Sequence, residues 1–201
     1  CRAYRVLGGP VGSAESEACE FDLLNADVAV PQELIDSVSG ENRYGTAVKL
    51  VEKCEFAPGG TVILASGDYA LPCMSAQGLS GVLDAPVLLS KHESLPDVVA
   101  QEIAQLSPTR VVVLGGDEVL SPDVEQAARD AAGESAVIER IDCNESVELS
   151  RLIYEYGARA AAAAGTPGWD KLAIIAHHDC IGDLITLSPL LIANRVPVFF
   201  I

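Results

Sequence analysis

Residues 62–90 read VILASGDYALPCMSAQGLSGVLDAPVLLS, and this stretch decides the fold. A short apolar run, 62–65, leads into the turn residues Ser-Gly-Asp at 66–68. A segment of helical length follows at 69–83, and a second apolar run occupies 85–89. Two apolar runs of four or five residues, separated by a helix-length segment, are typical of a βαβ unit with parallel strands.

The same pattern returns near the end of the chain. Residues 173–201, AIIAHHDCIGDLITLSPLLIANRVPVFFI, align with residues 62–90 without a gap. The aligned identities are Ile63/Ile174, Ala65/Ala176, Asp68/Asp179, Leu79/Leu190, Pro86/Pro197 and Val87/Val198. Matched hydropathy, with Asp and Pro in equivalent places, predicts an internal repeat.

Outside these two stretches, helical and strand patterns alternate. Apolar positions at helical spacing predict helices at 44–51, 94–106, 121–133 and 144–164, and short apolar runs predict strands at 4–9, 110–114 and 136–141. This alternation predicts an α/β fold, a doubly wound and mostly parallel sheet of flavodoxin/Rossmann-like repeats in about two tandem units, with right-handed crossovers.

The repeat suggests a division of the chain into modules. We expect residues 39–140 to form a complete repeat module, 141–201 a second and partial one, and 1–38 the tail of a preceding repeat. The second copy ends before its own VLGG strand, and YRVLGG at 4–9 is a strand of that kind. Either this strand completes the last unit, or the chain is a piece of a longer array. The first arrangement is favoured because an incomplete sheet exposes a long edge.

Composition excludes several classes of partner. The chain has 201 residues, with 29 acidic and 13 basic side chains and a formal net charge of −16. Such an acidic surface argues against non-specific binding to nucleic acid and against a polybasic patch that binds membranes. No apolar run reaches the roughly 20 residues that a membrane span needs. Because no charged-then-apolar leader opens the chain and its first residue is Cys1, we expect a segment of a longer protein.

The cysteines give no metal-cage spacing. The six are Cys1, Cys19, Cys54, Cys73, Cys143 and Cys180, and no two form a CxxC pair. We expect Cys54, Cys73 and Cys180 to be small buried apolar residues, since each lies in an apolar pattern. Cys1 and Cys19 are the best placed to pair with each other in an exported protein.

The carboxyl ends of the strands are the place to look for a ligand site. They collect Ser66, Gly67, Asp68, Ser90, Gly115, Gly116 and Asp117 in the first copy, and His177, His178 and Asp179 in the second. No GxGxxG opens a helix after a strand, and no GxxxxGK[ST] is present. His177, His178 and Asp179 are the best candidates for metal or acid–base chemistry. Because neighbours at a strand end point in different directions, we expect no shared site and assign neither a metal nor a catalytic residue.

Four segments in order resemble a known family. They are SGENRYGTAVKL at 39–50, VILASGDY at 62–69, APVLLS at 85–90 and VVVLGGDEVLS at 111–121. This set resembles the type 2 cell-wall-binding repeat of Gram-positive surface proteins. The resemblance implies a non-catalytic anchor of doubly wound α/β repeats, packed in threes about an approximate threefold axis. It implies non-covalent attachment to an anionic cell-wall polymer, while another domain supplies the activity.

The resemblance also implies candidate polymer-binding residues. The family's Pro-Ile-Leu-Leu motif falls on Pro86, Val87, Leu88 and Leu89, and in the second copy on Pro197 and Val198 followed by two phenylalanines. Its Arg-Tyr pair falls on Arg43 and Tyr44, where the second copy has Glu145 and Ser146. Asp68 completes the candidate set. A net charge of −16 repels an anionic polymer unless basic residues are local or a cation bridges, and Arg43, Lys49, Lys91 and Arg110 are the basic candidates.

The sequence therefore predicts a secreted, non-enzymatic cell-wall-binding module at the cell surface, without a cofactor. Its partners would be the anionic wall polymer and other copies of the repeat, in the same chain or as an oligomer, with no nucleic acid and no membrane insertion. A second hypothesis is a structural or oligomerisation module of the same fold without polymer binding. A third is a small-molecule or metal-dependent enzyme that uses the strand-end crevice with His177 and Asp179.

Overall fold

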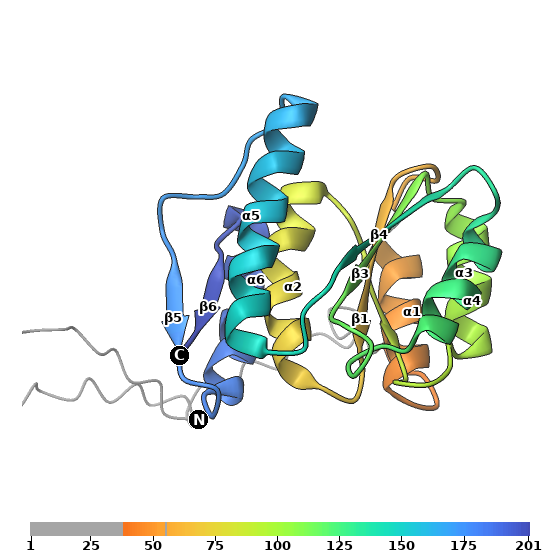
Figure 1. The fold of residues 1–201 in the computed structure, drawn as a ribbon, viewed down its shortest axis with the longest axis horizontal. Coiled ribbons are helices and arrows are strands. Elements are labelled where there is room, and N and C mark those ends of the chain that lie inside the picture. The colour runs from red at the N-terminus through yellow and green to blue at the C-terminus, as the bar shows by residue number, and fades with distance from the viewer. Residues whose placement is uncertain (1–37, 55) are drawn as a thin grey trace, which may run out of the picture. The chain divides into compact units, whose positions relative to one another are not determined.

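The structure is a computed structural model that describes residues 38–54 and 56–201 (Figure 1). The predicted strand at 4–9 and the predicted pairing of Cys1 with Cys19 lie outside the described residues.

In chain order the elements are α1 (Arg43–Cys54), β1 (Thr61–Ser66), α2 (Ala70–Leu83), β2 (Val87–Ser90), α3 (Asp97–Leu106), β3 (Arg110–Leu114), α4 (Pro122–Ala132), β4 (Val137–Ile141), α5 (Ser146–Ala164), β5 (Ile174–Ala176), α6 (Ile181–Asn194) and β6 (Val198–Phe200).

The first four strands form one parallel sheet. Their order is β2-β1-β3-β4, so β1 and β3 lie in the middle. Ile63 of β1 is opposite Val87 of β2 on one side and Val112 of β3 on the other. Every residue of β1 after Thr61 is buried, as expected for a central strand covered on both faces. The predicted doubly wound α/β fold is confirmed.

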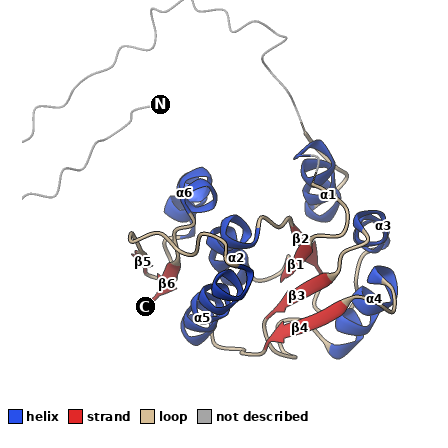
Figure 2. Ribbon diagram, turned by 90° about the horizontal axis from the view of Figure 1, so that it is seen from above, coloured by secondary structure: helices blue, strands red, loops and turns tan. Residues whose placement is uncertain are grey.

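Helices cover both faces of this sheet (Figures 1 and 2). On one face α1, α3 and α4 pack against Val62, Leu64 and the alternate residues of β3. On the other face α2 and α5 pack against Ile63, Ala65 and their neighbours. The period of two along each strand divides its side chains between these two cores. The helix α5 belongs to the predicted second module, yet it completes the first sheet, and the division at 140/141 stays a prediction.

The last part of the chain repeats the β1–α2–β2 unit as a smaller, two-stranded version. Strands β5 and β6 form a two-stranded parallel sheet, with Ile174 opposite Val198 as Ile63 is opposite Val87. The helices α2 and α6 end at equivalent residues, Asp84 and Arg195, which both adopt a left-handed conformation with φ of 49° and 55°. The two repeats therefore match even in the residue that ends each helix.

The two repeats meet along α2 and α6, which lie side by side (Figures 1 and 2). Glycines allow the close approach: a Cβ on Gly81 would lie 2.0 Å from the carbonyl oxygen of Ile192, and one on Gly78 would lie 2.2 Å from that of Val196. Leu71 and Met74 of α2 also pack into the core of the second repeat. Among the described helices, none is long and apolar enough to cross a membrane.

Candidate functional site

Asp68 ties together three segments at the carboxyl end of the first sheet. The hydroxyl of Tyr44 donates to Asp68 Oδ1 at 3.1 Å, and the amide of His92 donates to Asp68 Oδ2 at 3.1 Å. The guanidinium of Arg43 lies 3.9 Å from Asp68 Oδ1. The start of α1, the turn after β1 and the turn after β2 are therefore held by one carboxylate.

At the start of α1, Tyr44 packs inside the protein while the side chain of Arg43 is exposed to solvent. Tyr44 is 7% exposed, and its ring covers Gly67, where a Cβ would lie 2.6 Å from Tyr44 Cε1. Burial, and then the hydrogen bond to Asp68, raises the pKa of Tyr44 above its ordinary value. Arg43 donates to the carbonyl of Gly67, yet its side chain is 60% exposed. Arg43 thus combines an internal contact with a cationic surface that an external anion can reach.

The basic candidates do not form one patch. Arg43 lies at the carboxyl end of the strands, and Lys91 is exposed beside His92 at the same end. Lys49, further along α1, donates to the carbonyl of Ser39 at 2.6 Å. Arg110 begins β3, at the amino end of the sheet, and lies 3.6 Å from Glu139. The expectation that all four are neighbours is wrong, because Arg110 is a strand length away from Arg43.

The apolar motif is part of the core. Pro86 and Leu88 are buried, while Val87 and Leu89 are half-buried against the packed faces. In the second repeat Pro197 and Val198 are also buried. Burial gives Leu88 and Val198 a packing role and leaves their side chains almost no surface for a polymer. A role of this motif in polymer binding stays a prediction, and it would have to use the half-buried positions or the edge of β2, which is an outer strand of the described sheet.

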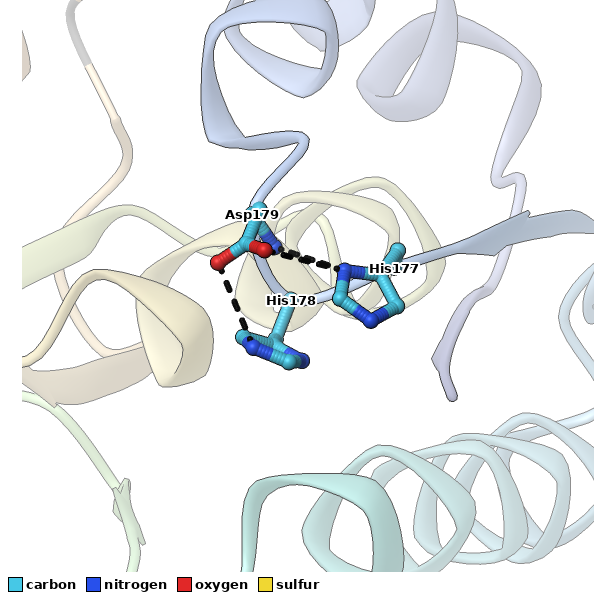
Figure 3. A group of neighbouring side chains, drawn as sticks. All are labelled: His177, His178 and Asp179. Carbon is cyan, nitrogen blue, oxygen red and sulfur yellow. Dashed lines mark hydrogen bonds and ion pairs between the residues drawn. The ribbon is translucent and has the colours of Figure 1, made fainter.

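In the second repeat the structure gathers three polar side chains that we expected to diverge (Figure 3). The rings of His177 and His178 are 4.0 Å apart between centroids, and both contact Asp179. The expectation fails because β5 ends at Ala176. Residues 177–180 form a turn closed by the amide of Cys180 on the carbonyl of His177, and a turn does not alternate its side chains as a strand does.

Sequence reasoning named Ser66 at a strand end but not its hydrogen bonds, and it missed Arg140. Ser66 Oγ accepts the amides of Asp68 and Tyr69 and so forms the turn after β1. Arg140 reaches from β4 to the turn after β3, where it donates to the carbonyls of Gly115 and Leu120, both at 2.9 Å. A lone Arg in the strand pattern VIERI was the available signal for Arg140.

The cysteines behave differently from one another. Cys73 lies under the turn after β1, and its thiol donates to the carbonyl of Ser66 at 2.8 Å. Burial raises the pKa of Cys73 to about 12, an effect that Arg43 only partly opposes. Cys54 is exposed, so its predicted burial is wrong: it lies at the end of α1, off the stripe of Tyr44, Val48 and Val51. Cys180 is only half-buried.

These environments predict selective thiol labelling. At pH 8 the native protein should react at Cys54, whereas Cys73 should react roughly 1,000-fold more slowly than an ordinary thiol, because the nucleophile is the thiolate and a pKa near 12 leaves little of it. Raising the pH toward 12 should increase the rate at Cys73. Peptide mapping after timed exposure to a maleimide measures both sites, and equal native rates at Cys54 and Cys73 would contradict the prediction. Unfolded protein, in which both thiols are exposed, is the control.

Two hollows lie at the other end of the sheet, where the strands begin. One, of about 300 Å³, is lined by Thr61, Arg110, Arg195 and the ends of α2 and α5. The other, of about 720 Å³, is lined by Thr61, Pro86 and the turns before β1 and β3. Neither of these two hollows is lined by Arg43, Tyr44 or Asp68.

Comparison with known proteins finds a family match over part of the chain. Residues 37–125 match the family described as Cell wall binding domain 2 (CWB2). The resemblance carried by the four sequence segments is thereby confirmed, and the Arg43–Asp68 group lies within the wall-binding domain. Such a domain is a binding module.

Curated relatives share most of this chain. It is 26% identical over 163 residues to the "Amidase enhancer" of Bacillus subtilis (strain 168), a match that covers 81% of this chain and 21% of that protein. It is 24% identical over 178 residues to "N-acetylmuramoyl-L-alanine amidase LytC" of the same strain, over 89% of this chain and 33% of that protein. The chain therefore spans between a fifth and a third of the length of these relatives.

Solved structures share the fold. Cwp6 from Clostridium difficile superposes with a TM-score of 0.70 at 21% identity, over 82% of this chain and 24% of Cwp6. Cwp8 from the same organism superposes with a TM-score of 0.66 at 23% identity, over 82% of this chain and 27% of Cwp8. Because 82% of the chain is more than the segment 37–125, the shared fold covers residues beyond the CWB2 match.

Proposed function

We propose that this chain is a non-catalytic module that anchors an exported surface protein to an anionic polymer of the cell wall. The observation that carries the proposal is the CWB2 match over residues 37–125, which makes cell-wall binding the function of that segment. The names of the relatives add support, since they are an amidase and an amidase enhancer of which this chain resembles only a part. The activity of the whole protein would then lie in another domain.

The exposed strand-end surface of the first repeat is the proposed contact for the polymer. It contains the 60% exposed guanidinium of Arg43 and the exposed Lys91, in a chain with a net charge of −16. Attraction between charges falls off within about 10 Å in 0.1 M salt, so these local cations count for more than the distant acidic residues. Tyr44 and Asp68 would hold Arg43 in place.

Sedimentation with purified Gram-positive cell walls tests the proposal. The folded chain should pellet with walls and remain in the supernatant without them. Parallel samples with calcium and with a chelator show whether a cation bridges the two anionic partners. No pelleting with walls in either condition would overturn the anchoring function.

A variant locates the contact. Arg43→Gln should weaken wall binding roughly 5- to 10-fold, since one charge-assisted contact to an anion contributes about 1–1.4 kcal/mol. The control is Arg129→Gln, which removes an exposed positive charge from α4, where Arg129 pairs with Glu125 at 3.2 Å. Titrating each variant against walls, with thermal unfolding measured in parallel, separates binding from stability. Equal losses for both variants would mean that total charge, and not the Arg43 surface, governs binding.

The second hypothesis, a module that assembles without binding polymer, is favoured by one observation. The α2–α6 contact is built for close packing of one repeat against another, through Gly78 and Gly81. A chain that fails to pellet with walls and forms stable oligomers in sedimentation velocity would support this function. We retain residues 39–140 and 141–201 as the proposed modules of such an assembly.

A further inference from the structure

We propose that His177, His178 and Asp179 bind a divalent transition-metal ion of the zinc class. The three side chains come from the turn between β5 and α6 and converge on one side of it (Figure 3). One ligand atom from each lies within 4.8 Å of the other two. This site is independent of the proposed wall binding.

The distances suit a small ion. His177 Nδ1 lies 3.4 Å from Asp179 Oδ2, and His178 Nε2 lies 3.2 Å from Asp179 Oδ1. Zinc binds imidazole nitrogen and carboxylate oxygen at about 2.0–2.2 Å, which makes neighbouring ligand atoms in a tetrahedral site about 3.3–3.5 Å apart. The amide of Asp179 makes a 3.4 Å contact with the same Nδ1, which the metal would replace. Because each imidazole faces a different oxygen of Asp179, the three exposed side chains would rotate to bind one ion.

Comparison of the repeats shows what is particular to this turn. The equivalent carboxylate in the first repeat, Asp68, is occupied by Tyr44, the amide of His92 and Arg43. In the described structure Asp179 has only the two imidazoles around its carboxylate and is 77% exposed. The second repeat has thus replaced a carboxylate held by donors with a carboxylate beside two metal-ligand side chains.

The donor set selects the class of metal. Two imidazoles and one carboxylate suit Zn²⁺, Ni²⁺ and Cu²⁺, whereas Ca²⁺ and Mg²⁺ prefer sites made of oxygen atoms. His177 and His178 are 52% and 57% exposed, so the remaining coordination positions face solvent. Water or an external oxygen ligand would complete the coordination.

Titration of the whole chain with zinc chloride tests the proposal. Protein treated with a chelator and then dialysed under reducing conditions should bind one zinc ion in isothermal titration calorimetry. His177→Gln, His178→Gln and Asp179→Asn should each weaken the affinity by at least about 10-fold, a loss that even second-shell changes cause at metal sites. All three positions are exposed, so circular dichroism should show an unchanged fold.

Two controls make the result specific. Asp183→Asn removes an exposed carboxylate from the first turn of α6 and should leave the affinity within about 2-fold, because this residue is outside the cluster. The absorption spectrum of bound Co²⁺ should lack thiolate charge-transfer bands, which would indicate the cysteines. Absence of binding at millimolar zinc, a thiolate spectrum, or an unchanged affinity in the His177→Gln/His178→Gln double variant would each overturn the proposal.

Discussion

Gly81→Ala should destabilise this chain, although alanine favours a helix over glycine. The added Cβ would lie 2.0 Å from the carbonyl oxygen of Ile192 and 3.0 Å from its carbonyl carbon. Backbone atoms cannot rotate away as a side chain can, so α2 and α6 must move apart. Overpacking typically costs about 1–3 kcal/mol. Replacing glycine by alanine in a helix gains about 1 kcal/mol, which offsets only part of a cost near the top of that range. We expect a net loss of up to about 2 kcal/mol in the free energy of unfolding, toward the upper end because the clash is with backbone atoms.

Fluorescence of Trp169 can follow the effect of Gly81→Ala on unfolding. Trp169 is its single tryptophan, and its ring stacks on Tyr154 with centroids 5.7 Å apart. The same ring would be 2.9 Å from a Cβ on Gly78, so it lies beside the contact between the repeats. Denaturant unfolding followed by Trp169 fluorescence therefore reports on the two repeats coming apart. Hydrogen exchange should show lost protection in β5, β6 and α6, while β1 and β3 remain protected.

The matched control is the same substitution in the other helix. Gly182 lies in the first turn of α6, and a Cβ there would meet nothing within 4 Å. Gly182→Ala should therefore be neutral or stabilising by up to about 1 kcal/mol, because only the backbone entropy of glycine is removed. The two variants are expected to differ in sign. If Gly81→Ala is as stable as Gly182→Ala, then the close approach of α2 and α6 is not a constraint on this fold.

The helices and strands, and their order, were predictable because the signals are local. The runs at Val62–Ala65 and Val111–Leu114 are apolar on both faces, and such runs form central strands of a parallel sheet. The alignment of the two repeats without a gap carried this prediction to β5, α6 and β6. Which helix covers which face depends on contacts far apart in sequence, so the position of α5 against the first sheet was not predicted.

At the candidate site, the family resemblance named candidate residues but not their contacts. Arg43, Tyr44 and Asp68 were predicted one by one, while their association with the amide of His92 depends on two separate turns meeting. The approach of His177 to His178 depends on backbone angles of a turn, which side-chain periodicity does not describe. A charged residue inside a strand, such as Arg140, is read as a surface position until its partners are known.

Arg140→Leu should be among the most destabilising single substitutions in the chain. Its side chain is 13% exposed, and its Nε donates to Glu125 Oε2 at 2.7 Å. Its Nη1 donates to the carbonyls of Gly115 and Leu120, so one guanidinium connects β4, the turn after β3 and the start of α4. Removing one partner of a largely buried pair typically costs about 3–5 kcal/mol, and the partial exposure of Glu125 places the expected loss at about 2–4 kcal/mol.

The control acts on the same carboxylate. Arg129 also pairs with Glu125, at 3.2 Å and four residues away on α4, but its side chain is 44% exposed. Arg129→Gln should cost only about 0.3–0.5 kcal/mol, and this cost should vanish in high salt. The loss in Arg140→Leu should persist in high salt, since most of its hydrogen bonds go to uncharged carbonyls. Denaturant unfolding at low and high salt measures both variants, and equal losses would refute a structural role specific to Arg140.

A second substitution separates the charge of Arg140 from its hydrogen bonds. In the Arg140→Leu/Glu125→Leu double variant Glu125 is absent, so any cost of its losing Arg140 is removed, while the exposed Arg129 loses its pairing with Glu125. The carbonyls of Gly115 and Leu120 still lack their donor in that protein. If the double variant recovers most of the lost stability, the ion pair dominates. We expect recovery of less than half, because two of the three short bonds of Arg140 end on the backbone of the turn. The VLGG turn of this wall-binding repeat would then be held from outside, by a residue of the neighbouring strand.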